Sequence, residues 1–247
     1  MTAHPSPRVE VHESADDLAA SVAGAFVRLV ADCQASGEIP HVALTGGTIA
    51  EAIHREIARL APESDVDWSR IDFFWGDERF VAPESADRNA GQARAAFLDV
   101  VGVDPARIHE MPSTADAASV EAAATSYSEA VRSVGAGRFH LTMLGVGPDG
   151  HVASLFPGFP QLDVEDEIAV AVTDSPKPPP ERVSLTFAAL NRSEEVWFVA
   201  SGDGKAEAVG RALAATAPDI HEIPAVGVRG EAATIWFLDR ESASQVS

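Results

Sequence analysis

The chain alternates short apolar runs with longer stretches in which apolar residues recur three or four positions apart. The short runs predict strands, at residues 8–12, 41–44, 71–75, 139–144, 168–173, 195–200 and 234–238. The periodic stretches predict helices, at residues 16–34, 49–60, 89–100, 116–134 and 204–215. Alternating strands and helices indicate an α/β fold in three layers, with a mostly parallel sheet covered by helices on both faces. With no internal repeat and no long linker, residues 1–247 are expected to form one domain.

Glycine-rich or charged segments directly follow three of the predicted strands. They are Thr45-Gly46-Gly47-Thr48, Gly76-Asp77-Glu78-Arg79 and the stretch that begins with Gly145. In open parallel sheets, ligands bind outside the carboxyl ends of the strands. We therefore expect these three strand ends to converge on one crevice.

The first of these segments joins a strand to a helix through two glycines. Backbone N–H groups at a helix start can cradle a phosphate, and Gly46 and Gly47 would let a ligand approach closely. An ordinary tight turn with Thr48 as N-cap explains the segment equally well. The Gly-Lys-Ser/Thr ending of a Walker loop is absent, which excludes a nucleotide loop of that type.

The stretch at residues 145–157 contains three glycines in the spacing of a dinucleotide fingerprint. Such a turn must open a helix that packs on the sheet, but Pro157 and Pro160 interrupt any helix here, so we reject a cofactor role. Asp149 and His151 remain on this turn. A single His is more often structural, but a His beside a carboxylate at a strand end is a credible general base.

The net charge of −20 and the pI of about 4.6 argue against nucleic acid and anionic membranes as partners. An anionic substrate would then need cations concentrated at its site, and lysine occurs only at Lys177 and Lys205. Lys205 begins a predicted helix, where its positive charge is unfavourable beside the helix dipole unless an anion lies between them. An exposed lysine explains the position equally well. Arg182 follows a proline-dense stretch, residues 176–180, which predicts either a stiff active-site flap or a plain loop.

The remaining composition predicts a cytoplasmic protein that binds no metal. Cys33 is the only cysteine, so a disulfide within the chain is excluded, and its helical context predicts a small core residue. The other histidines do not have the spacing of metal ligands. The acidic residues 163–167 are typical of a solvated loop. We find no signal peptide and no apolar stretch long enough to span a membrane.

Five segments, in this order and spacing, resemble the 6-phosphogluconolactonase family. They are Thr45-Gly46-Gly47-Thr48, Gly76-Asp77-Glu78-Arg79, residues 145–157 with the specific run Asp149-Gly150-His151, Arg182-Val183-Ser184-Leu185-Thr186, and Gly204-Lys205-Ala206. One small departure lies in the first turn, where the family often has serines in place of the two threonines and a proline near Ile49. The threonines keep the hydroxyls.

The resemblance implies a Rossmann-like fold and hydrolysis of 6-phospho-D-glucono-1,5-lactone to 6-phosphogluconate, a step of the oxidative pentose phosphate pathway. It implies a small sugar-phosphate lactone as partner and no metal or organic cofactor. We expect a monomer or weak homodimer.

The same resemblance assigns roles to individual residues. His151, oriented by Asp149, is expected to activate water, and Arg79 to contact the oxyanion, with help from a backbone N–H near Gly46 or Gly147. The phosphate is expected against Gly47, Thr48, Arg182 and Lys205. Asp77 would bond a sugar hydroxyl or hold Arg79.

Two other functions fit parts of the sequence. The glucosamine-6-phosphate deaminase branch of the superfamily shares the glycine turns, but it has an acid where Phe156 stands and usually a Tyr at the position of Arg79; both differences favour the lactonase. A non-catalytic sugar-phosphate sensor would keep Arg182 and Lys205 without needing His151.

Overall fold

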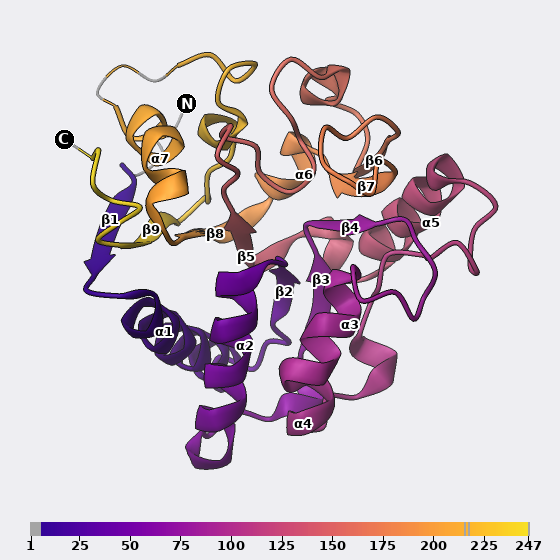
Figure 1. Ribbon diagram of the computed structural model, residues 1–247. Coiled ribbons are helices and arrows are strands. Elements are labelled where there is room, and N and C mark those ends of the chain that lie inside the picture. Colours follow the sequence, from indigo (N-terminus) through magenta and orange to yellow (C-terminus); the bar gives the residue numbers. More distant parts are fainter. Residues whose placement is uncertain (1–5, 215, 217, 247) are drawn as a thin grey trace.

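The computed structural model describes residues 6–214, 216 and 218–246, and its centre is a sheet of six parallel strands (Figure 1). The strands are β1 (Arg8–His12), β2 (His41–Leu44), β3 (Asp72–Trp75), β5 (Phe139–Gly145), β8 (Ser193–Ala200) and β9 (Ala233–Asp239). Their order across the sheet is β1-β9-β8-β5-β2-β3. Every one of these pairs is parallel, which confirms the prediction of a parallel sheet.

Helices flank this sheet. They are α1 (Ala15–Ala35), α2 (Thr48–Leu60), α3 (Asn89–Ala93), α4 (Asp99–Val101), α5 (Val120–Ser133), α6 (Phe187–Leu190) and α7 (Ala206–Ala212). A π-helical turn, Arg94–Leu98, joins α3 to α4, so the predicted helix at residues 89–100 is confirmed as one continuous segment. Short 3-10 turns occur at Ala61–Glu63, Trp68–Arg70, Pro105–Arg107, Gly135–Gly137, Pro160–Asp163, Asp203–Lys205 and Pro224–Gly227.

By length and mean composition, helix α1 is the one described helix that could cross a membrane, although charged residues interrupt its apolar run, as expected from the sequence. Its apolar side chains Leu18, Val22, Phe26 and Val30 are instead fully buried in the core of this protein. Helix α2 packs alongside it (Figure 1). We therefore interpret α1 as a core helix.

A second, smaller sheet was not predicted. It consists of β4 (Asp77–Arg79), β7 (Arg182–Leu185) and β6 (Ala169–Val172), all antiparallel. The predicted strand at residues 168–173 therefore exists but lies outside the parallel sheet. The polar residues 76–87 that follow the predicted strand at 71–75 predict a loop in the sequence; this prediction is wrong at β4, because buried hydrogen-bond partners compensate the charges of this strand.

Two helix boundaries differ from the prediction by three residues or more. Helix α5 starts at Val120 rather than at residue 116, because Ser119 caps it by accepting a hydrogen bond from Ala122 N. Asp116 lies upstream and accepts hydrogen bonds from Ser113. Helix α7 ends at Ala212, and the last predicted position, residue 215, lies outside the described residues.

The strand order creates a crevice between β2 and β5. These strands are neighbours, but the chain leaves β2 toward β3 on one side and leaves β5 toward β8 on the other. Ligands of open α/β sheets bind at such a reversal, outside the carboxyl ends of the strands. The topology thus places a site where the two glycine turns begin.

Candidate functional site

A cavity of about 640 Å³ opens at this reversal, within the range of small-molecule sites. It brings together most of the residues that the sequence analysis selected: Gly46, Gly47, Thr48, Asp77, Arg79, His151, Arg182 and Lys205. The ends of β2 and β5 are joined there, because Gly145 N donates to Thr45 Oγ1 at 3.2 Å. The expected convergence of the strand ends is therefore confirmed.

The first glycine turn presents the start of α2 to the cavity. Gly47 is the N-cap residue, with φ of 99°, a left-handed conformation that favours glycine. Thr48 is already inside the helix, so the N-cap interpretation of Thr48 is wrong. The first helical bond runs from Glu51 N to Gly47 O, which leaves the preceding N–H groups of the first turn without helical partners. Such a helix start attracts an anion.

Asp149 and His151 form a directly bonded pair at the cavity wall. Asp149 Oδ1 lies 2.5 Å from His151 Nδ1. With its proton on Nδ1 for this bond, the neutral ring keeps a lone pair on Nε2. The ring packs on Phe156, with 4.6 Å between centroids, and His151 O accepts from Gly147 N at 2.8 Å. The pair is therefore held in the arrangement of an oriented base.

The glycine at position 147 makes this pair possible. A Cβ on Gly147 would collide with the ring of His151 and with Asp149 Oδ1. Partial burial raises the pKa of the Asp149 carboxyl, but the hydrogen bond and charge of His151, with Lys177 nearby, lower it overall to about 2. Asp149 is thus ionised throughout the physiological pH range.

The charged side chains of strand β4 lie partly at the cavity and partly in the core. Asp77 is buried, accepts from Ser154 Oγ at 2.6 Å and lies 4.0 Å from an Arg182 nitrogen. Arg79 donates to the carbonyl of Asp87. Glu78 turns inward, where it accepts from Asn89 N and Ala90 N at 2.8 Å each; burial raises the pKa of its carboxyl. Glu78 therefore holds the start of α3 and does not line the cavity.

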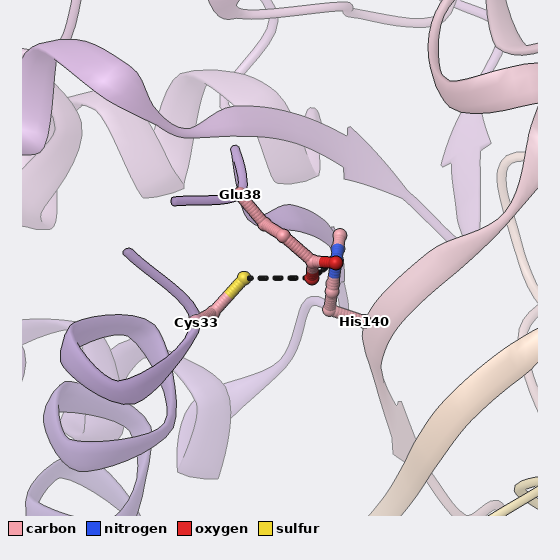
Figure 2. A group of neighbouring side chains, drawn as sticks. All are labelled: Cys33, Glu38 and His140. Atoms are coloured by element: carbon pink, nitrogen blue, oxygen red, sulfur yellow. Dashed lines mark hydrogen bonds and ion pairs between the residues drawn. The ribbon is translucent and has the colours of Figure 1, made fainter. Parts of the chain in front are cut away.

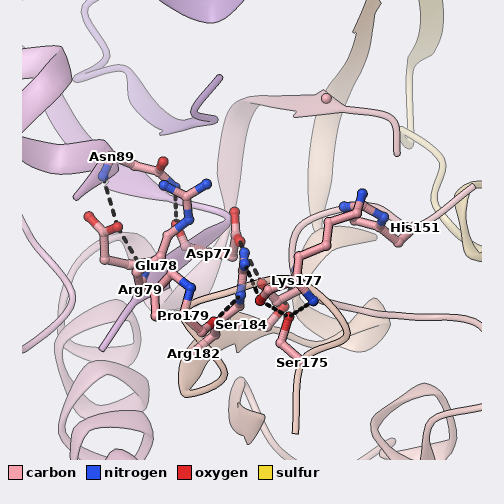
Figure 3. A network of polar contacts seen from close by, with 12 residues as sticks. Asp77, Glu78, Arg79, Asn89, His151, Ser175, Lys177, Pro179, Arg182 and Ser184 are labelled. Carbon is pink, nitrogen blue, oxygen red and sulfur yellow. Dashed lines mark hydrogen bonds and ion pairs between the residues drawn. The ribbon is translucent and has the colours of Figure 1, made fainter. Parts of the chain in front are cut away.

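Arg182 uses most of its donors to hold the proline-dense loop (Figure 3). It donates to the carbonyls of Lys177, Pro178 and Pro179 at 3.0, 3.3 and 3.2 Å. Burial lowers the pKa of its guanidinium, although Asp77 opposes this. Lys177 and Pro178 are consequently part of the cavity wall. Of the two predictions for this stretch, their position supports an active-site loop rather than a plain surface loop.

Comparison with known proteins identifies the family. Residues 13–236 match the family described as glucosamine-6-phosphate isomerases/6-phosphogluconolactonase. A 6-phosphogluconolactonase of Streptomyces coelicolor is 39% identical over 250 residues, spanning 98% of this chain and 95% of that protein. The chain belongs to this family.

Solved structures of this family share the fold. The crystal structure of 6-phosphogluconolactonase from Thermotoga maritima has a TM-score of 0.83 and 27% identity, over 95% of this chain and 100% of that one. A monomeric glucosamine-6-phosphate deaminase has a TM-score of 0.82 over 96% of this chain and 99% of that one. At 19% identity, that second likeness shows the fold alone.

Among the cavity residues that the sequence analysis did not select are Lys177 and Asn89. Lys177 extends from the proline-dense loop toward His151 (Figure 3), and its Nζ lies 3.9 Å from Asp149 Oδ1. Burial and the charge of Lys177 lower the pKa of Lys205. The rarity of lysine in the chain was a signal for Lys177, whereas nothing in the sequence marked Asn89 except its place after β4.

Among the described residues, one further cluster of ligand-type side chains lies toward the amino ends of the strands. Cys33, Glu38 and His140 offer atoms within 4.8 Å of one another (Figure 2). His140 Nδ1 accepts from His41 N at 3.0 Å, so the ring proton sits on Nε2, 3.0 Å from Glu38 Oε2. A metal would need the lone pair of that Nε2, so this arrangement does not fit a metal site.

Cys33 in this cluster also corrects a prediction. It is partly exposed beside Glu38 rather than buried in the core. Burial, followed by the charges of Glu38 and Glu194, raises the pKa of the thiol to about 11. The thiol therefore stays protonated at neutral pH and is a poor metal ligand.

Proposed function

We propose that this protein hydrolyses 6-phospho-D-glucono-1,5-lactone to 6-phosphogluconate, with His151 as the general base. Its enzyme class, carboxylic ester hydrolase, follows from its similarity to 6-phosphogluconolactonases over nearly its whole length. The observation that carries the mechanism is that His151, bonded to Asp149 behind it, lines one cavity with Lys205 and the start of α2.

In the proposed reaction, His151 Nε2 takes a proton from water as the oxygen attacks C1 of the lactone. Asp149 stabilises the imidazolium that forms. The tetrahedral oxyanion meets Arg79 and a backbone N–H at Gly46. The N–H of Gly147 does not serve, because it already donates to His151 O. Collapse breaks the bond from C1 to the ring oxygen, and the imidazolium returns its proton to that oxygen.

The phosphate of the substrate is proposed to lie at the start of α2, against Gly47 and Thr48. Lys205 provides a charge-assisted hydrogen bond there. Arg182 adds positive charge from the wall, since its Nε and Nη2 donors are engaged by the loop and its Nη1 lies 4.0 Å from Asp77. Asp77 is held by Ser154 and faces the cavity, which favours contact with a sugar hydroxyl.

Phe156 supports lactone hydrolysis over deamination. In the deaminase branch, the corresponding acid is expected to relay protons with the histidine. Here the side chain is a phenyl ring, fully buried and packed on His151. No proton can pass through it.

We also propose a cellular location and an oligomeric state. The acidic chain is proposed to act in the cytoplasm on a free small molecule, without nucleic acid or membrane, as a monomer or weak homodimer.

The test is an assay with freshly made lactone, corrected for spontaneous hydrolysis. The wild type should hydrolyse the lactone and release no ammonia from glucosamine 6-phosphate. His151→Ala should lower kcat by about 100- to 10,000-fold, the usual contribution of a general base. His140→Ala, in the opposite cluster, is the control and should change kcat less than about 2-fold. An unchanged kcat in His151→Ala at saturating lactone would exclude the base assignment.

A further inference from the structure

The side chain of Asn89 is buried at the wall of the cavity. Only 3% of the residue is exposed, yet it lines the cavity beside Gly46 and Arg79. Two bonds hold it. Its backbone N donates to Glu78 Oε1 at 2.8 Å, and its Nδ2 donates to the carbonyl of Asp77 at 2.9 Å. Because a carbonyl can only accept, the amide nitrogen must face Asp77, which sets the orientation of the amide.

The other end of this amide has no partner. Among the described residues, nothing donates to Asn89 Oδ1, which is buried. A buried acceptor without a donor is costly and rare in native proteins, and it often marks a functional role. The oxygen lies against Gly46, where a Cβ would overlap it. The glycine turn therefore leaves room for an acceptor at the wall of the substrate cavity.

The chemistry of the acceptor limits what can complete it. The lactone carbonyl and ring oxygen only accept hydrogen bonds, and an ionised phosphate does so as well. Of the groups on a sugar lactone phosphate, the ring hydroxyls at C2, C3 and C4 are the donors. We propose that Asn89 Oδ1 accepts a hydrogen bond from one of these hydroxyls and so makes Asn89 a residue that determines substrate specificity. This inference rests on the function proposed above and deepens it.

The consequence is selection by hydroxyl group. A site with a buried acceptor rejects an analogue that lacks the matching hydroxyl, because the acceptor is then left unpaired in the complex. Glu78 fixes the backbone N–H of Asn89 and the carbonyl of Asp77 fixes its Nδ2, so the amide cannot turn away to find another partner.

The experiment compares kcat/KM of the wild type and Asn89→Leu for four substrates. These are the parent lactone and the three 6-phosphogluconolactones that lack the hydroxyl at C2, C3 or C4. The wild type should lose about 10- to 100-fold on one of the three deoxy substrates. Asn89→Leu should lose a similar factor on the parent but show no further loss on that same deoxy substrate. Gln92→Leu, which removes an amide from the next turn of this helical segment, should behave as wild type.

Two outcomes would overturn the inference. An equal loss in Asn89→Leu on all four substrates would show that the amide only holds Asp77 in place. No loss on the parent would show that the substrate does not meet the oxygen. If Asn89→Leu does not fold, Asn89→Ser is compared in the same way. Failure of the proposed function would look different, because the wild type would then hydrolyse none of the lactones.

Discussion

Two cavities of this molecule each contain a histidine beside a carboxylate, but they differ in what the histidine can do. One, of about 640 Å³, lies at the carboxyl ends of the strands and contains His151 with Asp149 at its edge. The other, of about 550 Å³, lies toward the amino ends of the strands and contains His140 with Glu38. Cavity size and residue type alone would not distinguish them.

The difference is in the second nitrogen of each ring. His151 gives Nδ1 to Asp149 and keeps the lone pair of Nε2 for the cavity. His140 has both nitrogens engaged, Nδ1 by the N–H of His41 and Nε2 by Glu38. A histidine–carboxylate pair is therefore a base only where the fold leaves one nitrogen free. In the first cavity cations outnumber acids and a helix start can receive an anion, whereas acids outnumber cations in the second.

In this comparison, the largest effect is expected from a substitution at Gly147 that displaces the Asp149–His151 pair. Gly147→Ala places a Cβ against His151 and Asp149, so the ring must move. We expect kcat to fall about 100-fold, as for other small displacements of catalytic groups. Lactone kinetics and thermal unfolding measure this. Gly91→Ala, where a Cβ meets no atom within 4 Å, is the control and should keep both kcat and Tm. A normal kcat in Gly147→Ala would mean that the pair does not need its observed geometry.

A smaller effect tests a lysine of the first cavity, since no lysine lines the second. Lys205→Ala removes a charge-assisted contact to the phosphate and should raise KM about 10- to 100-fold with little change in kcat. Arg211→Ala, in helix α7 that follows Lys205 but paired with Glu222 at 2.6 Å, should leave KM unchanged. A fall in kcat without a rise in KM would place Lys205 near the reacting carbon instead.

The smallest effect concerns a third histidine, which lies in neither cavity. His54 in α2 is 3% exposed and stacks near Phe97, and burial lowers the pKa of its ring to about 3. Since the unfolded chain protonates this ring near pH 6.5, the stability that depends on neutral His54 is complete above that pH and is lost as pH falls toward 3. Between pH 7.5 and 5.5, His54→Leu should therefore lose about 1 kcal/mol less stability than the wild type in urea unfolding.

The control for this prediction is His221→Leu. His221 is partly exposed, so the variant should lose stability in acid as the wild type does. Equal acid losses in His54→Leu and the wild type would show that His54 takes up a proton as easily in the folded protein as in the unfolded chain.

The parallel sheet was predictable because its inner strands are buried on both faces. Such strands are mainly apolar, as in Asp72–Trp75, where three aromatic residues follow the aspartate and every residue is buried. Strand β4 was missed because its three residues are charged, a pattern typical of loops. Only tertiary partners such as Ser154 and the start of α3 make those charges compatible with burial. Periodicity cannot reveal partners so distant in sequence.

The site was predictable to the extent that its residues follow strand ends. His151, Asp77 and Gly46 each follow a strand of the parallel sheet, and the topology brings those ends together. Lys177 was not selected because its position depends on Arg182 holding the loop carbonyls. Asn89 was not selected because an unpartnered oxygen is visible only in three dimensions.

The central claim is that His151 carries a free Nε2 in the cavity that binds the sugar phosphate, whereas His140 does not. Imidazole ¹⁵N NMR of the wild type at neutral pH tests it directly. We predict a proton on Nδ1 of His151 and on Nε2 of His140, and a shift of the His151 Nε2 resonance alone when 6-phosphogluconate is added. The same tautomer in both rings, or a shift confined to His140, would contradict the account.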